Sequence, residues 1–261
     1  MKKIIIYICL SVVLGGCSIY RPYKRPDVAV VDSLYRRQIS PADSAASIAD
    51  LSWKELFTDP QLQKLIERGL RNNSDLGIAR LRVKEAEALL KSARLSYLPS
   101  VNLSPQGTIS KAEHGKTTKT YDLAASASWE IDIFGKLTNA KREARAVLEQ
   151  SEAYRQAVQT QLIATIANNY YTLLMLDEQL NISRRTAENW NENLRVMKAL
   201  KRAGQTTDMA VAQTEAGKLS VDASLLSLER QITELENTLS SLLGSASGDI
   251  TRSTLSGQSF P

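Results

Sequence analysis

The chain has 261 residues, with 33 Lys and Arg against 28 Asp and Glu, so its formal net charge is +5; only 6% of its residues are aromatic. The charges are interspersed without a long basic block, which argues against a nucleic-acid-binding surface. The low aromatic content and the long stretches without proline or glycine favour elongated helices over a globular enzyme.

The N-terminus has the pattern of a bacterial lipoprotein signal. Two lysines precede an apolar core, Ile4 to Leu14, which is too short to span a bilayer as a helix. Small residues follow, and then Cys17. This order resembles a lipobox, so we expect residues 1–16 to be a removed signal peptide and Cys17 to be the lipidated first residue of the mature chain. The alternative is an ordinary signal peptide with an incidental cysteine.

Residues 17–59 are predicted to be a lipid anchor followed by an extended linker. Pro22, Pro26 and Pro41 interrupt this segment, and proline removes a backbone donor and favours open backbone. The pair Asp59-Pro60 at its end is typical of a helix start, with Asp as the cap and Pro at the first helical position.

The first helix is predicted within residues 60–98, from about 60 to about 96, and Pro99 stops it. Its apolar residues recur every three or four positions, which indicates one buried stripe. The members of this stripe are Leu62, Leu65, Ile66, Leu70, Leu76, Val83, Ala86, Leu89, Leu90 and Ala93.

Two strands are predicted within residues 99–134, each with roughly the 9–11 residues that a tilted membrane strand needs. Apolar and polar residues alternate in both, which suits an apolar outer face and a polar inner face of a water-filled barrel. A hairpin packed on a soluble core is the alternative, because alternation fits either. One face carries Val101, Leu103, Gly107, Ile109, Tyr121, Leu123, Ala125, Ala127, Trp129, Ile131 and Ile133.

Residues 135–244 are predicted to form a long antiparallel helical hairpin. Its first helix runs to about residue 203 and would extend roughly 100 Å at about 1.5 Å per residue. Gly204 breaks the helix, Thr207 is a plausible N-cap, and a second helix follows from about 208 to 243. This second helix carries an apolar stripe at heptad spacing: Leu225, Leu228, Ile232, Leu235, Leu239 and Leu242. The tail, 245–261, is rich in Ser, Gly and Thr and is predicted to be flexible and unpacked.

The most informative stretch joins the second strand to this long helix: Trp129, Glu130, Ile131, Asp132, Ile133, Phe134 and Gly135. With Lys136, it resembles the strand-to-helix junction of the TolC-like outer membrane factor family, the exit ducts of tripartite efflux pumps and type I secretion systems. With the lipobox, the chain is similar to the outer membrane efflux lipoproteins of the NodT/OprM-type branch. Supporting matches are Tyr23-Lys24-Arg25-Pro26, Trp53 through Phe57, Asn73-Ser74-Asp75-Leu76, Tyr97-Leu98-Pro99 and Gly204 to Glu215.

The resemblance implies a mainly α fold with a membrane β-hairpin, in a trimer. Each protomer of a typical member gives four strands to a twelve-stranded barrel, and its helices form a tube across the periplasm. A periplasmic adaptor docks at the tip of the tube, here Gly204, Gln205, Thr206, Thr207 and Asp208, and an inner-membrane pump powers transport. The duct lies in outer membrane lipid, extends into the periplasm, needs no cofactor and catalyses no reaction.

The chain departs from the family pattern in two respects. It contains one repeat, and ends where the second should begin, so we expect a fragment, a truncated product, or a half-size duct whose six copies would give the same barrel. The residues that close the periplasmic end belong to the second repeat, so no gate residue is assigned. Ala210 also stands where the family often has an acidic residue.

Two other functions compete with a passive duct. A lipid-anchored periplasmic adaptor would also carry a helical hairpin, but it needs flanking domains of many short strands. An enzyme has little support: His114 is the single histidine and lies in a predicted loop, and no metal-ligand cluster, phosphate loop or nucleophile elbow is found. Trp190 lies on the apolar stripe of the first helix of the hairpin, where core packing is favoured over a substrate platform. The transported substrate stays open.

Overall fold

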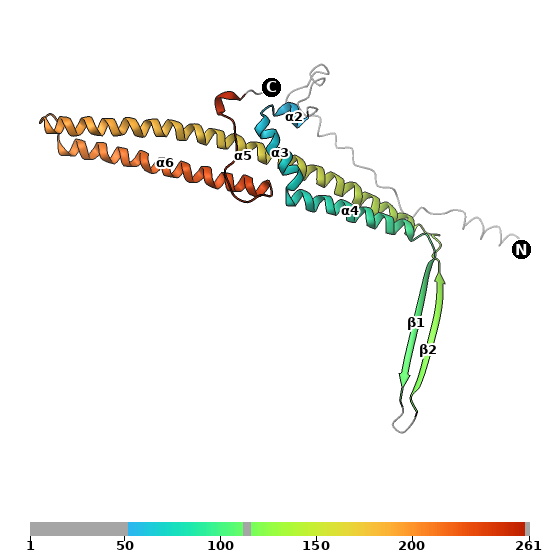
Figure 1. Cartoon of the computed structure of the whole chain (residues 1–261). Coiled ribbons are helices and arrows are strands. Elements are labelled where there is room, and N and C mark those ends of the chain that lie inside the picture. Colours follow the sequence, from blue (N-terminus) through green and yellow to red (C-terminus); the bar gives the residue numbers. More distant parts are fainter. Residues whose placement is uncertain (1–51, 112–115, 259–261) are drawn as a thin grey trace, which may run out of the picture. The chain divides into compact units, whose positions relative to one another are not determined.

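A computed structural model describes residues 52–111 and 116–258. The predictions for the signal peptide, Cys17, most of the linker and His114 lie outside the described residues. The order of elements confirms a mainly α fold with one β-hairpin and one long helical hairpin (Figure 1). The elements are α2 (Trp53–Leu56), α3 (Pro60–Asn72), α4 (Ser74–Leu95), β1 (Ser100–Ser110), β2 (Thr118–Ser128), α5 (Lys136–Arg202), α6 (Asp208–Leu242) and η4 (Leu255–Gly257).

The predicted single helix over 60–96 is wrong, because Asn73 divides it into α3 and α4. Asn73 has extended backbone angles and its side-chain oxygen accepts from the Leu76 amide at 3.0 Å, which makes it the N-cap of α4. Its side-chain nitrogen donates to the Leu242 carbonyl at the end of α6, at 3.0 Å. The interruption therefore joins α4 to a helix far along the chain.

The hydrophobic core follows α5. Figure 1 shows α4 beside the first part of this helix and α6 beside the rest, and α3 also packs on α5. Five buried residues of α5 recur at heptad intervals, as in a coiled coil. They are Ile166, Leu173, Leu180, Ala187 and Leu194.

The stripe predicted for the second long helix is confirmed in α6. Ile232 and Leu239 are buried, and four neighbours on the stripe are partly buried against the same core. These four are Leu225, Leu228, Leu235 and Leu242. Among the helices of the described ranges, none combines the length and apolar character that crossing a bilayer requires.

Trp190 packs between the two long helices, as its place on the stripe predicts. A Cβ atom added at Gly217 of α6 would lie 2.6 Å from the Trp190 ring. The ring therefore occupies the space that any larger residue at position 217 would need, and packing explains this tryptophan.

The tail is packed, so the prediction of a flexible segment over 245–261 is wrong for its described part. We call residues 249–258 the strap. Ile250 is buried, with 8% of its surface exposed, and belongs to the core. Composition alone misleads here, because the contacts that hold the strap come from Asp59, α5 and α6.

Arg252 of the strap connects the two long helices. Its guanidinium donates to both carboxylate oxygens of Asp177 on α5, at 2.5 and 2.8 Å, and to Glu236 on α6. Only 17% of the Arg252 side chain is exposed. The hydrogen bonds that Arg252 donates to Asp177 and Glu236 hold its pKa well above its usual range. This three-residue network fixes where the strap crosses the helical hairpin.

The buried carboxylate of Asp59 receives the end of the strap. It accepts hydrogen bonds from the Tyr170 hydroxyl at 2.5 Å, the Ser253 hydroxyl at 3.1 Å and the Gln258 amide at 2.9 Å. Burial raises the pKa of Asp59, but these bonds outweigh it and leave the pKa below the ordinary value of 3.8. The charged form therefore stabilises the fold above pH 3.8, and this contribution is lost as the pH falls through the lowered pKa.

We expect Gly217→Ala to destabilise the helical hairpin. The added methyl group would gain about 1 kcal/mol of helix propensity but would overlap the Trp190 ring, and overpacking costs about 1–3 kcal/mol. The expected net loss in free energy of unfolding is about 1 kcal/mol, measured by urea unfolding followed by circular dichroism. Gly77→Ala is the control, since a Cβ there meets nothing within 4 Å and should add about 0.5–1 kcal/mol. A similar gain from both variants would contradict the packing of Trp190.

Arg252→Met should destabilise the protein by about 1.5–3 kcal/mol, because it leaves two carboxylates without their shared partner. The same urea titration gives this number. Arg230→Met is the matched control: Arg230 pairs with Glu234 one turn along α6, at 2.5 Å, with both side chains mostly exposed. Such pairs contribute about 0.5 kcal/mol or less. Equal small losses in the two variants would mean that the strap is not held by Arg252.

Candidate functional site

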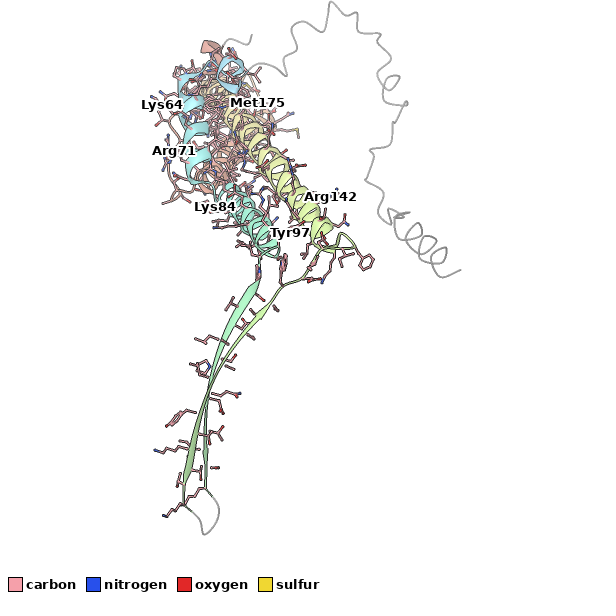
Figure 2. All side chains as sticks on the ribbon, turned by 90° about the vertical axis from the view of Figure 1, so that its right-hand side faces the viewer. Lys64, Arg71, Lys84, Tyr97, Arg142 and Met175 are labelled. Carbon is pink, nitrogen blue, oxygen red and sulfur yellow. The ribbon has the colours of Figure 1, made fainter. Side chains whose placement is uncertain are left out.

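The β1–β2 hairpin exposes every residue of both strands. Figure 2 shows its side chains standing off both faces of the two-stranded ribbon. Large apolar residues are among them: Leu103 is 65% exposed, Leu123 73% and Tyr121 78%. A two-stranded hairpin is marginally stable in water, and soluble proteins rarely leave a row of such residues uncovered. The surroundings of the hairpin must therefore cover these apolar residues and stabilise the strands, because packing within the described chain does not.

The register divides these residues into an apolar and a polar face. The strands pair antiparallel from Ser100 opposite Ser128 to Ser110 opposite Thr118, and opposed residues share a face. The alternation predicted from the sequence is present over both strands. The apolar face carries Val101, Leu103, Pro105, Gly107, Ile109, Lys119, Tyr121, Leu123, Ala125 and Ala127. The polar face carries Ser100, Asn102, Ser104, Gln106, Thr108, Ser110, Thr118, Thr120, Asp122, Ala124, Ser126 and Ser128.

Two aromatic residues mark a band on this hairpin. Tyr121 and Trp129 have the same parity and are eight residues apart, about 27 Å along an extended chain. A strand tilted by about 40° reduces this to about 20 Å, close to the apolar band of about 25 Å in membrane barrels, which aromatic girdles flank. The Trp129 indole nitrogen also donates to the Tyr97 carbonyl at 3.1 Å, so its polar edge is satisfied.

The second strand ends earlier than predicted. The alternating pattern extends it to Ile133, but β2 ends at Ser128, and residues 129–135 form an extended link and a turn. Ile131, Ile133 and Phe134 of this link are exposed. The pairing stops because β1 begins at Ser100, which leaves no partner beyond Ser128.

Asp132 turns the chain into α5. Its carboxylate accepts from the backbone amides of Leu137 at 3.0 Å and Thr138 at 2.9 Å, and from the Thr138 hydroxyl at 2.6 Å. The Thr138 hydroxyl, followed by the amides, lowers the pKa of Asp132. Gly135 stands in the N-cap position with φ of 75°, a left-handed conformation that glycine adopts without strain. Asp132 therefore supplies the cap that Gly135 lacks.

Glu130 is also engaged in the junction, where it pairs with Lys136 at 2.7 Å. Glu130 and Asp132 are the two acidic residues of the junction motif. In the structure both lie at the entry to α5, one capping the helix and one paired with its first residue. The alternation of apolar and polar residues did not predict these contacts. An acidic residue near a helix N-terminus is nevertheless stabilising, so the position of Asp132 three residues before Gly135 could have indicated its capping role.

The predicted tip is a tight turn between α5 and α6. Gly204 has φ of 73°, and the amides of Gly204 and Gln205 donate to the carbonyls of Lys201 and Leu200, both at 2.9 Å. This is a Schellman arrangement, which closes the end of α5. Thr207 then caps α6, with its hydroxyl accepting from the Ala210 amide at 3.2 Å.

The surface of the tip is mostly polar. Gln205, Thr207 and Asp208 are exposed, Thr206 is half-buried, and Asp208 pairs with Lys201 across the turn. Met209, directly after them, is 79% exposed. The five predicted docking residues are thus contiguous on one accessible turn.

The described ranges hold no group of three or more His, Cys, Asp or Glu residues placed to bind a metal ion. Asp59 and Asp132 each accept several hydrogen bonds, have lowered pKa values and cap helices. Their arrangement is that of structural carboxylates.

A family model described as outer membrane efflux protein matches residues 65–245. The probable outer membrane lipoprotein SilC of Salmonella typhimurium is 31% identical over 237 residues, which are 89% of this chain and 51% of that protein. The cation efflux system protein CusC of Escherichia coli K12 is 27% identical over 91% of this chain and 52% of its own length. The chain thus spans about half the length of the curated relatives it matches.

Solved structures agree with the sequence matches. A crystal structure of CusC superposes with a TM-score of 0.73 at 26% identity, over 92% of this chain and 54% of that one. The open state of the Neisseria gonorrhoeae MtrE outer membrane channel gives a TM-score of 0.70 at 25% identity, over 90% and 53%. These matches favour the duct over the adaptor among the functions considered above. The chain belongs to the outer membrane efflux protein family.

Proposed function

We propose that this chain is a component of the outer-membrane exit duct of a tripartite efflux or secretion system. It would give small molecules a passive route from the periplasm to the outside. The observation that carries this proposal is the two-faced β1–β2 hairpin. No other part of the described chain covers its apolar face. Lipid would cover the apolar face, and water would solvate the polar face.

A single hairpin cannot form a closed barrel. Each of its strands has one edge whose backbone groups find no partner within the two-stranded sheet. Unpaired backbone groups are costly in lipid, so membrane strands close into barrels. We infer that further hairpins of the same kind, from other copies or from a second repeat, complete the barrel. The assembly is a homo-oligomer, and a trimer if each protomer carries both repeats.

The α5–α6 hairpin is the periplasmic part of this proposal. The 67 residues of α5 extend roughly 100 Å, long enough to carry the tip far from the membrane. The accessible turn, Gly204, Gln205, Thr206, Thr207 and Asp208, would dock a periplasmic adaptor, and an inner-membrane pump would supply the energy. The junction motif, Trp129 to Gly135, would set the exit of the chain from the membrane.

The N-terminus would add a lipid anchor. A lipidated Cys17 inserts acyl chains into the same membrane as the hairpin, and several chains hold a protein far more firmly than one. This anchor would keep each copy at the membrane before its strands find partners.

The cargo is proposed only as small molecules or ions delivered by the pump. The relatives are named for different cargoes, cation efflux for CusC and toluene efflux for TtgC of Pseudomonas putida. A duct with a polar inner face is compatible with this range.

Two adjacent substitutions test the proposal in cells. Leu123→Arg places a charge on the apolar face, where it costs about 2–4 kcal/mol at the bilayer midplane, while Ala124→Arg places the same charge on the polar face. Outer membranes carrying the chain with its own signal are run on gels without boiling. We expect a heat-labile oligomer for the parent chain and Ala124→Arg, and much less for Leu123→Arg.

Two results would contradict the proposal. One is a chain that stays soluble in the periplasm or appears only as a monomer. The other is equal oligomer from both arginine variants, since a hairpin in water does not distinguish its two faces in this way.

A further inference from the structure

Asp122 is the one charged residue on the polar face of β1 and β2. The other eleven positions of that face carry hydroxyl, amide or alanine side chains. The single basic residue within the two strands, Lys119, lies opposite Ile109 on the apolar face, next to the start of β2. A face of polar but neutral groups is thus interrupted by one carboxylate.

The carboxylate of Asp122 is exposed and uncompensated within the described residues. Its cross-strand neighbour is Gln106, whose amide carries no net charge, and no ion pair to Asp122 is found there. The acids further along the same parity differ, because Glu130 is paired with Lys136 and Asp132 caps α5. Of these three acids, Asp122 is the one that neither pairs with a cation nor caps a helix among the described residues.

We propose that Asp122 sets the charge selectivity of the duct. The inference rests on the proposed function, in which the polar face lines the water-filled lumen. Symmetry then repeats the carboxylate in every copy at one height, which makes a ring of negative charge. Rings of Asp or Glu favour cations, since they raise the local cation concentration and repel anions.

The strand geometry places this ring toward the loop end of the barrel. Asp122 is four residues from Thr118, where β2 begins, or about 14 Å along the strand, and seven residues, about 24 Å, from Trp129. It adjoins Tyr121, the aromatic residue at one border of the apolar band. Cations would therefore be favoured near the loop end of the barrel lumen, away from the strand ends that lead to α4 and α5.

Coulomb's law gives the size of the effect. A unit charge about 10 Å away in water changes the local cation concentration by about twofold, and a ring multiplies this factor. The screening length falls from about 10 Å at 0.1 M salt to about 3 Å at 1 M. The preference should therefore be clear at 0.1 M and weak at 1 M.

The test is the ratio of potassium to chloride permeability in planar bilayers under a KCl gradient. The protein is the assembly purified from outer membranes. We expect a ratio above one for the parent, a fall of about twofold or more in Asp122→Asn, and a ratio below one in Asp122→Lys. Asp122→Glu keeps the charge and should keep the ratio. The double variant Gln106→Asp, Asp122→Asn moves the carboxylate to the opposed strand on the same face and should restore it.

The outcomes separate the two proposals. Pores of unchanged selectivity in Asp122→Asn would overturn the role of Asp122 and leave the duct intact. Selectivity lost in Asp122→Asn but not restored by Gln106→Asp would overturn the ring, because a structural effect of the substitution would then account for the loss. No conductance from any assembly would overturn the proposed function, and the inference with it.

Discussion

One helix, α5, is longer than any single partner, and the rest of the structure depends on how its apolar side is covered. Helices in water gain most of their stability from the burial of such a side. The hairpin partner α6 has 35 residues against 67 in α5, so it covers only part of the length. The remainder is covered by α4, which comes from before the β-hairpin (Figure 1). The order of helix, hairpin and long helix follows from this requirement.

The place where α4 gives way to α6 needs contacts that neither helix supplies. The Asn73 amide reaches the Leu242 carbonyl there, and a Cβ at Gly244 would lie 2.7 Å from the Asn72 backbone. The strap then crosses the same region, with Arg252 bridging α5 and α6 and with Asp59 at its far end. Buried ion pairs contribute little net stability, but they penalise any other arrangement of their partners. We interpret the strap as the device that fixes which helices meet at this point.

Periodicity made the regular parts of this fold predictable. The helical hairpin, its tip with Gly204 and Thr207, the α6 stripe and the two-faced strands all repeat a local pattern that a sequence displays. The exceptions depend on partners distant in the chain. Asn73 reads as an ordinary helical residue until Leu242 is known to lie beside it. The strap contains Ser, Gly and Thr, and its packing depends on Asp59, Tyr170, Asp177 and Glu236. The end of β2 is set by the start of β1.

The central claim is that the two faces of the β1–β2 hairpin meet lipid and water respectively, and single cysteines along β2 test it most directly. If Cys17 is lipidated and Cys9 removed with the signal, the mature chain offers no free thiol of its own. Variants with a single cysteine at each position from 121 to 127 are then treated with a water-soluble thiol reagent in intact outer membranes. Strong labelling at 122, 124 and 126 with weak labelling at 121, 123, 125 and 127 is the result predicted. Equal labelling at all seven positions would contradict the account, because it would place both faces in water.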